Sequence, residues 1–477
     1  MEIEKLNIES IVQEVLLELS RVKTPEADET CKQSRFHTND GVFNSMDEAI
    51  EAAHAAQYEL IQLSLEKRKI IINVMREAVL KNVDEIAKMA VMETKLGKIS
   101  DKVNKNILAA QKTPGLEDIE AKAFTGDNGF TLVERAPYGV IGAITPSTNP
   151  SETVICNSIG MVSAGNSVVF NCHPGAKNVT NFTIQLLNRA IVQAGGPANL
   201  LCSVNEPTIE TGKLLMSHPK IRLMVVTGGP EIVKIAMGSG KKVIAAGPGN
   251  PPVVVDETAD IKQAAKDIVD GAAFDNNVLC IAEKEVFVVE RVADRLMENM
   301  LKNGAFLLSS NQLDKLMTFI TTKNSKGELM PDKKFVGRDI GVILGTIGVK
   351  APEGVILAVA DVPKHHPLVN MEQLMPVLPV VRVKDVDEAI EEAFKAEQGN
   401  YHTAMMHSTN VQNLSKMAKK MNTSIFVKNA PSYAGLGMLG EGYTSFTIAS
   451  PTGEGITSPI SFTRQRRCVL KDQFRIV

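Results

Sequence analysis

Val140-Ile-Gly-Ala-Ile-Thr145 begins the part of the chain that decides its fold. This short apolar run has the length of a buried strand, and a helical pattern follows it as far as Gly165. Further strands are predicted at 167–170, 200–204 and 221–227, each followed by a helical pattern, the last at 230–237. Strands that alternate with helices predict an α/β protein with a parallel sheet and helices on its faces.

The same alternation continues outside this stretch. Helical patterns alone fill 45–97, before the first strand. A second alternating region begins with apolar runs at 253–255 and 285–289, and it resumes at 378–383 before a helix from Val386. A chain of 477 residues is long enough for two or more domains, so we expect two α/β regions in succession.

The bulk composition excludes several classes of function. The net charge of -3 provides no basic surface for neutralising phosphates, so a nucleic acid ligand is not expected. Apolar runs fall short of the roughly 20 residues that cross a bilayer, and the acidic, polar start does not resemble a secretion signal, so we expect a cytoplasmic protein with no membrane partner. The six cysteines include no Cys-x-x-Cys pair, which argues against a disulfide framework and a zinc site, and we expect five of them only to pack.

The first 40 residues differ from the rest. Apolar residues at positions 8, 11, 12, 15 and 19 predict a short amphipathic helix within 1–20, and the charged, Pro-containing segment 21–40 predicts a flexible linker. Such a helix could bind another protein or simply pack on the body of this one. Periodicity does not decide between the two.

Two motifs could carry chemistry. Thr227-Gly-Gly-Pro-Glu231 lies where a strand turns into a helix, so its backbone N–H groups could bind a pyrophosphate, although such turns also merely connect elements. Cys280 follows a polar segment in a loop before the strand at 285–289. A cysteine there is either a nucleophile or inert packing, and its position alone favours packing.

Six segments taken together resemble the aldehyde dehydrogenase superfamily, and within it the branch that makes acyl-CoA from short aldehydes. The resemblance covers Gly41 to the C-terminus. The segments occur in family order and are Tyr138-Gly-Val-Ile-Gly-Ala-Ile-Thr-Pro-Ser-Thr-Asn149-Pro, Gly165-Asn-Ser-Val-Val-Phe170, Thr227-Gly-Gly-Pro-Glu, Ala245-Ala-Gly-Pro-Gly-Asn-Pro-Pro252, Phe274-Asp-Asn-Asn-Val-Leu-Cys280 and Glu372-Gln-Leu-Met-Pro376.

The resemblance implies a role for each matching residue. Cys280 corresponds to the nucleophile that forms a thioacyl-enzyme, Asn149 to the side-chain donor of the oxyanion hole, and Glu372 to the carboxylate that holds the nicotinamide ribose. Other residues at the expected dinucleotide site are Thr145, Pro146, Thr227, Gly228, Gly229 and Glu231. The implied cofactor is NAD, with NADP left open, coenzyme A is the co-substrate, and no metal is expected.

Two departures from the wider family are informative. Hydrolytic members carry a glutamate 34 positions before the nucleophile, where it activates water, and this chain has Ala246 there. Without that base the thioester should persist until a thiol such as CoA accepts the acyl group. After Phe170, many relatives place a lysine and a glutamate that grip the adenosine ribose, whereas this chain has Asn171-Cys-His-Pro174, which leaves the choice between NAD and NADP open.

The resemblance also implies an organisation and a setting. We expect a Rossmann-like nucleotide-binding domain at 41–249, a catalytic domain at 250–440, and a small β oligomerisation arm at 119–138 that the C-terminal segment 441–477 joins, giving a homo-dimer or tetramer. Residues 1–20 resemble peptides that direct enzymes into bacterial microcompartments, where they would bind shell or cargo proteins. The expected substrate is propionaldehyde, then acetaldehyde.

Two rival interpretations remain. A phosphorylating or biosynthetic semialdehyde dehydrogenase would also lack the water-activating glutamate. An inactive structural cargo protein would need only the N-terminal helix, but the presence of both Cys280 and Asn149 argues against it.

Overall fold

The computed structural model describes residues 40–324 and 327–477. The helix predicted within 1–20 and nearly all of the linker predicted at 21–40 lie outside these residues. Within the described part, no helix has the length and apolar character needed to cross a membrane.

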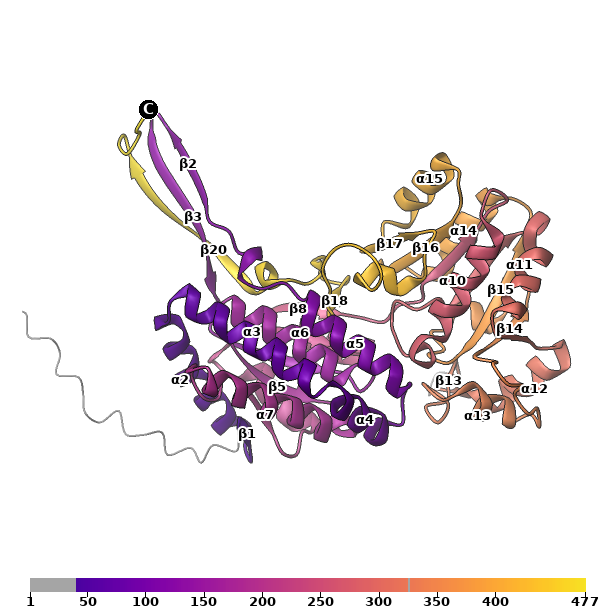
Figure 1. Ribbon diagram of the computed structural model, residues 1–477, viewed down its shortest axis with the longest axis horizontal. Helices are drawn as coiled ribbons and strands as arrows, with labels where there is room; N and C mark the ends of the chain where they lie inside the picture. The colour runs from indigo at the N-terminus through magenta and orange to yellow at the C-terminus, as the bar shows by residue number, and fades with distance from the viewer. Residues whose placement is uncertain (1–39, 325–326) are drawn as a thin grey trace, which may run out of the picture. The chain divides into compact units, whose positions relative to one another are not determined.

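The first sheet contains six parallel strands and confirms the α/β prediction (Figure 1). In spatial order they are β1 (Val42–Phe43), β6 (Leu201–Val204), β5 (Ser167–Cys172), β4 (Val140–Thr145), β7 (Ile221–Thr227) and β8 (Lys242–Ala246). The strands are buried, because helices cover both faces.

The strand order determines which helices share a face. From β4 the chain moves outward in one direction through α6 (Pro150–Ser163) and α7 (Lys177–Gln193), and it then crosses to the other side of β4 through α8 (Ile209–Ser217) and α9 (Pro230–Met237). Right-handed crossovers therefore place α6 and α7 opposite α8 and α9. The helices α3 (Leu65–Lys81), α4 (Val83–Thr94) and α5 (Ile99–Lys112) pack on α6 and α7, and α2 (Met46–Gln62) contacts α8.

The order in which the chain adds strands reverses at β4. The carboxyl ends of β4 and β7, at Thr145 and Thr227, are neighbours in the sheet, since Ile144 pairs with Val226. In open α/β sheets, ligands bind at this switch point, outside the carboxyl ends of the strands.

The second sheet contains seven parallel strands. In spatial order they are β11 (Ala305–Leu307), β14 (Leu357–Asp361), β15 (Val377–Val383), β10 (Glu285–Val289), β9 (Pro252–Val255), β16 (Thr403–His407) and β17 (Ile425–Lys428). We propose that the chain divides near residue 249, because the first sheet ends at Ala246 and the second begins at Pro252.

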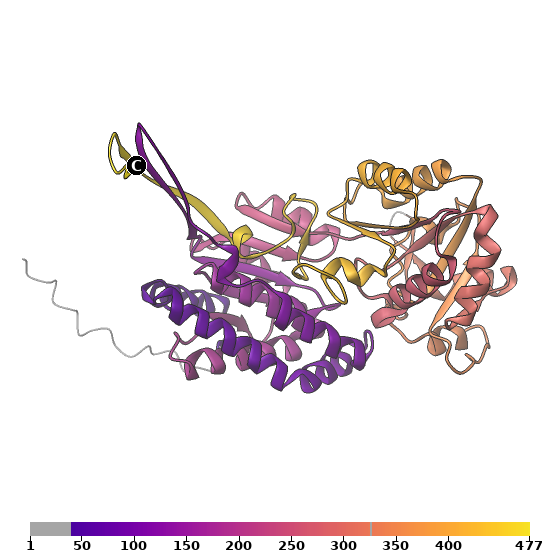
Figure 2. The ribbon, with the colours of Figure 1, turned by 45° about the horizontal axis from the view of Figure 1, so that its top comes forward.

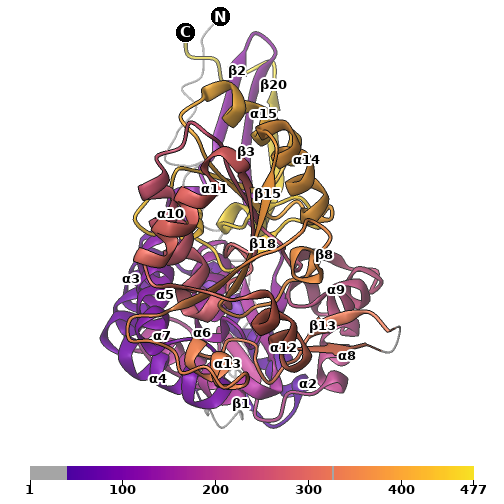
Figure 3. The ribbon, with the colours of Figure 1, turned by 90° about the vertical axis from the view of Figure 1, so that its right-hand side faces the viewer.

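Alternation along β10 fills two cores. Val286 and Val288 share one with α10 (Ile261–Ala273) and α11 (Glu290–Lys302), whereas Phe287 faces the other. The second core includes α12 (Ser310–Ile320), α13 (Ile340–Gly345), α14 (Val386–Glu397) and α15 (Val411–Met421). Figure 3 shows α10 and α11 on one side of β15, with α14 on the other.

A third, antiparallel sheet joins distant segments. β2 (Lys122–Gly126), β3 (Gly129–Pro137) and β20 (Thr463–Lys471) extend together beyond the helices of the first sheet (Figure 2). We call this sheet the arm. Cys468 on β20 is exposed, so the expectation that every cysteine other than Cys280 packs was wrong at this position, because both faces of the strand lack a covering layer. Cys156, Cys172 and Cys202 are buried, as expected.

Candidate active site

Cys280 follows a sharply turned, buried segment. Asp275, Asn276 and Asn277 all have positive φ, of 48°, 53° and 65°. Asp and Asn tolerate this left-handed conformation better than most residues, because their short polar side chains bond locally. The Asn277 amide donates to the carbonyls of Ala272 and Glu283, at 2.9 and 3.0 Å. The polar residues before Cys280 thus shape the loop that presents it.

Lys284 is buried beneath this loop and stabilises it through hydrogen bonds. Its fully buried ammonium donates to the side-chain oxygen of Asn277 at 2.8 Å and to the carbonyl oxygens of Leu279 and Ala282 at 2.9 and 3.3 Å. Burial lowers the pKa of Lys284, and the carboxylate of Glu372 opposes that shift. The lysine therefore holds the backbone on both sides of Cys280 and brings a positive charge near its thiol.

The Cys280 thiol is part-buried and is not acidic in the absence of ligands. Burial, and then the negative charge of Glu372, raise the pKa of Cys280 to about 12, against the opposing charges of Lys284 and Lys105. At neutral pH the thiol is therefore protonated, and it is a strong nucleophile only when that proton is removed.

Glu372 and Gly249 lie beside Cys280. The Gly249 N–H donates to Glu372 Oε1 at 3.3 Å. A methyl group at Gly249 would come within 2.7 Å of the Cys280 carbonyl oxygen and 3.0 Å of His402 Cγ, so only glycine fits this close approach. The structure therefore brings Glu372 and Cys280 into the same neighbourhood, on either side of Gly249.

His402 was missed by the sequence reasoning. The residue is buried against Gly249, its Nδ1 shares a hydrogen bond of 2.9 Å with Thr403, and its Nε2 has no partner within the described residues. Burial lowers the pKa of His402 to about 4, and Lys284 adds to that shift, so the imidazole is neutral at pH 7. The sequence carried no signal for it, because an isolated histidine before a strand is usually structural.

Asn149 caps α6 and is held by a buried lysine. Its side chain is 6% exposed, and its Oδ1 accepts a hydrogen bond of 2.6 Å from Lys105 on α5. Within the described residues, its Nδ2 donates one hydrogen bond, a long one of 3.3 Å to Thr148. Because Lys105 occupies the oxygen of the amide, the nitrogen end is the one that remains available to a ligand.

Lys105 belongs to a cluster of four fully buried charges, which we call the buried ion cluster: Lys102, Lys105, Glu152 and Asp275. Lys105 lies 2.6 Å from Asp275 and 3.0 Å from Glu152, and Lys102 lies 3.2 Å from Asp275. Lys102 also donates to the carbonyl of Thr148 at 3.1 Å. The cluster therefore connects the Asn149 segment to the loop that carries Cys280.

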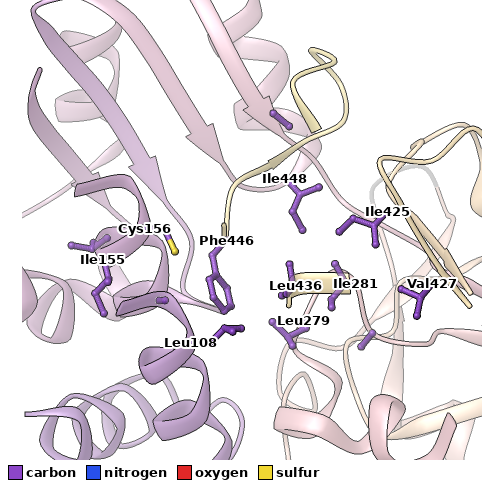
Figure 4. Close-up of a cluster of buried hydrophobic side chains, with 14 of the residues drawn as sticks. Leu108, Ile155, Cys156, Leu279, Ile281, Ile425, Val427, Leu436, Phe446 and Ile448 are labelled. Atoms are coloured by element: carbon purple, nitrogen blue, oxygen red, sulfur yellow. The ribbon is translucent and has the colours of Figure 1, made fainter. Parts of the chain in front are cut away.

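Apolar side chains exclude water around these polar groups. Figure 4 shows Phe446 beside Leu108 and near Cys156, with Leu279 and Leu436 across from them. Lys105 Nζ is 5.9 Å from the centre of the Phe446 ring. A pocket of about 660 Å³ is lined by Phe274, at the start of the segment that leads to Cys280, and by Leu108, Tyr433 and several polar residues.

The predicted dinucleotide residues lie at the switch point of the first sheet. Thr145 is 2% exposed and its hydroxyl has no partner within the described chain, while Pro146 is part-buried. Gly228 is part-buried at the end of β7, Gly229 caps α9 with open space around it, and Glu231 is exposed in the first turn. These residues fit a dinucleotide, because an orphaned hydroxyl and an accessible helix N-terminus meet where phosphates bind.

Ala246 ends β8 and is 4% exposed. The chain continues from it through Gly247 and Pro248 to Gly249, where a side chain would collide with the Cys280 carbonyl. A methyl group cannot accept a proton, so this position provides no base for water.

The fold and site define the class of protein. The model of the aldehyde dehydrogenase family matches residues 33–443, and the chain belongs to this family. It is 48% identical to the acetaldehyde dehydrogenase (acetylating) EutE of Salmonella typhimurium over 473 residues, which cover 99% of both chains.

Two solved structures are similar throughout. The Rhodopseudomonas palustris propionaldehyde dehydrogenase with bound propionyl-CoA is 49% identical, with a TM-score of 0.89 over 94% of this chain and 98% of that one. A propionaldehyde dehydrogenase from the fucose utilisation bacterial microcompartment of Clostridium phytofermentans is 48% identical, with a TM-score of 0.89 over 92% and 100% of the two chains.

Proposed function

We propose that this chain oxidises a short aldehyde, propionaldehyde first and acetaldehyde next, to its acyl-CoA with NAD and coenzyme A. The observation that carries the proposal is that the chain has both Cys280, on a loop stabilised by Lys284, and Ala246 at the position where hydrolytic relatives have their base. Similarity to enzymes named as acetylating or as binding propionyl-CoA supports it.

The first step is attack by the Cys280 sulfur on the aldehyde carbon. We propose that the thiol proton passes to Nε2 of His402, which has no partner within the described residues, as the C–S bond forms, because the pKa values of about 12 for Cys280 and about 4 for His402 disfavour transfer before attack. The carbonyl oxygen becomes an oxyanion, which the Asn149 amide and the Cys280 N–H stabilise. Removing one such donor typically slows an enzyme about a hundredfold or more.

The second step transfers hydride and leaves a thioester. Glu372 would hold the ribose of a nicotinamide cofactor and the β4 and β7 ends its phosphates, and the nicotinamide ring would accept the hydride. Because Ala246 cannot activate water, the acyl group remains on Cys280 until the CoA thiolate attacks the thioester carbon. The C–S bond to Cys280 then breaks, and acyl-CoA leaves.

The decisive test measures NADH formation from propionaldehyde and NAD with and without CoA. Wild type should need CoA for steady turnover, Cys280→Ala should be inactive, and Ala246→Glu should gain CoA-independent turnover because it restores a carboxylate. Steady turnover of the wild type without CoA would overturn the proposal. Dependence on inorganic phosphate would favour a phosphorylating semialdehyde dehydrogenase instead, and folded wild type without turnover would favour an inactive cargo protein.

We also propose a bacterial microcompartment as the setting. A relative from such a compartment supports it, and residues 1–20 are the proposed docking segment for shell or cargo proteins. A volatile, toxic aldehyde would be consumed there before it escapes. The arm is the proposed element for assembly into a dimer or tetramer, and NADP remains an alternative to NAD.

A further inference from the structure

Lys105 makes three short contacts from a fully buried position. Its ammonium lies 2.6 Å from Asn149 Oδ1, 2.6 Å from Asp275 Oδ2 and 3.0 Å from Glu152 Oε1. These partners belong to different parts of the chain: Asn149 and Glu152 to the first turn of α6, and Asp275 to the loop before Cys280. Because Lys105 has no contact with solvent, its ammonium can act only through the residues that it contacts.

The contact with Asn149 determines which end of the amide is free. If the amide were rotated by half a turn, its NH₂ group would face the ammonium, and two donors would oppose each other. Lys105 therefore fixes Oδ1 toward itself and leaves Nδ2 for the reacting oxygen. A charged donor on Oδ1 also draws electron density from the amide, which makes the opposite N–H a stronger donor.

We propose that Lys105 is a positioning residue for the oxyanion: it locks and polarises the Asn149 amide while fixing, through Asp275, the loop of Cys280 against it. This inference rests on the proposed function, because it assigns Asn149 to the oxyanion. Asp275 and Glu152 outweigh the effect of burial and hold the pKa of Lys105 above the usual lysine value, so the ammonium stays charged.

Lys102 offers a matched control one turn earlier on α5. It is equally buried and also contacts Asp275, but it donates to the backbone carbonyl of Thr148 and not to the Asn149 amide. The four cluster residues carry two positive and two negative charges. Lys105→Met with Glu152→Gln leaves Lys102 and Asp275, and Lys102→Met with Glu152→Gln leaves Lys105 and Asp275. Both variants keep one buried cation beside one buried anion, so neither leaves an isolated charge.

The experiment measures the first turnover of NADH formation with propionaldehyde and NAD but without CoA. This readout does not depend on the later acyl acceptor, so it remains informative if the proposed acceptor is wrong. Lys105→Met/Glu152→Gln should slow this step by roughly tenfold to a hundredfold, and Lys102→Met/Glu152→Gln should slow it much less. An unchanged melting temperature verifies that each variant is folded.

A double-mutant cycle with Asn149→Ala separates positioning from general support of the fold. If Lys105 acts through Asn149, replacing Lys105 in an Asn149→Ala background should slow the first turnover by less than about threefold. Independent, multiplying losses would overturn the inference, as would equal losses in the Lys102 and Lys105 variants. A wild type that forms no NADH in the first turnover would instead refute the proposed function itself.

Discussion

At the scale of single residues, Glu372 and Lys284 oppose each other at the Cys280 thiol. The carboxylate of Glu372 is the second cause, after burial, of the raised pKa of Cys280, and the Lys284 ammonium works against it. Glu372→Gln removes a negative charge, so it should lower the thiol pKa and increase the thiolate fraction at any pH below that pKa.

The measurement is the rate of iodoacetamide alkylation of Cys280 between pH 7 and 10 without cofactor. The wild-type rate should rise with pH and not level off, because the pKa of Cys280 is about 12. Glu372→Gln should react several-fold faster at each pH, since one pKa unit changes the thiolate fraction about tenfold. Glu285→Gln is the control, because it makes the same neutral replacement at a second fully buried glutamate, whose pKa burial raises well above its usual value. An equal or slower rate in Glu372→Gln would contradict the prediction.

The residues of the site differ in how far sequence could reveal them. Cys280 and Asn149 lie in segments whose order and spacing resemble a known family. Lys102 and Lys105 could not be found this way, because lysines on a helix are nearly always exposed, and their partner Asp275 is 173 positions from Lys102. His402 is likewise defined only by the backbone of Gly249 that approaches it in space.

At the scale of elements, the central strands were the easiest to predict. Those at 140–145, 221–227 and 285–289 have the predicted bounds, because parallel strands buried on both faces are continuous apolar runs. The left-handed run at 275–277 could not be predicted, since no residue there is glycine and the conformation depends on tertiary hydrogen bonds. The pairing of β3 with β20 joins segments more than 300 positions apart, which periodicity cannot show.

The arm exposes apolar side chains that a further layer could cover. Phe124 is 59% exposed and Val469 is 65% exposed. Large exposed apolar residues on an antiparallel sheet predict an association surface. Phe124→Asp with Val469→Asp should therefore reduce the oligomeric mass measured by light scattering after size exclusion. Val411→Asp, at a residue 72% exposed on α15, is the control. The prediction fails if wild type is monomeric or if the arm variant keeps the wild-type mass.

At the scale of the whole molecule, the residues assigned to catalysis depend on contacts between the two α/β regions. Asn149 and the Cys280 loop belong to different α/β regions and share Lys105, while Thr447 of the C-terminal segment shares a hydrogen bond of 2.9 Å with Thr227 at the end of β7. Neither region alone therefore assembles the site. The N-terminal segment, by contrast, precedes every residue used in the mechanism, so targeting and turnover should be separable.

Deleting residues 1–20 should leave kcat with propionaldehyde unchanged and abolish co-purification with microcompartment shells. A finer test places two aspartates on the predicted apolar face, Ile8→Asp with Val15→Asp, and two on polar positions, Asn7→Asp with Gln13→Asp. Both pairs add the same charge to the same segment, so they differ only in the face they change. If the apolar face docks the enzyme, only the Ile8→Asp/Val15→Asp variant should fail to co-purify with the shells. Equal co-purification of both variants with the shells would contradict docking through that face. Loss of turnover when residues 1–20 are deleted would show that the segment belongs to the folded body.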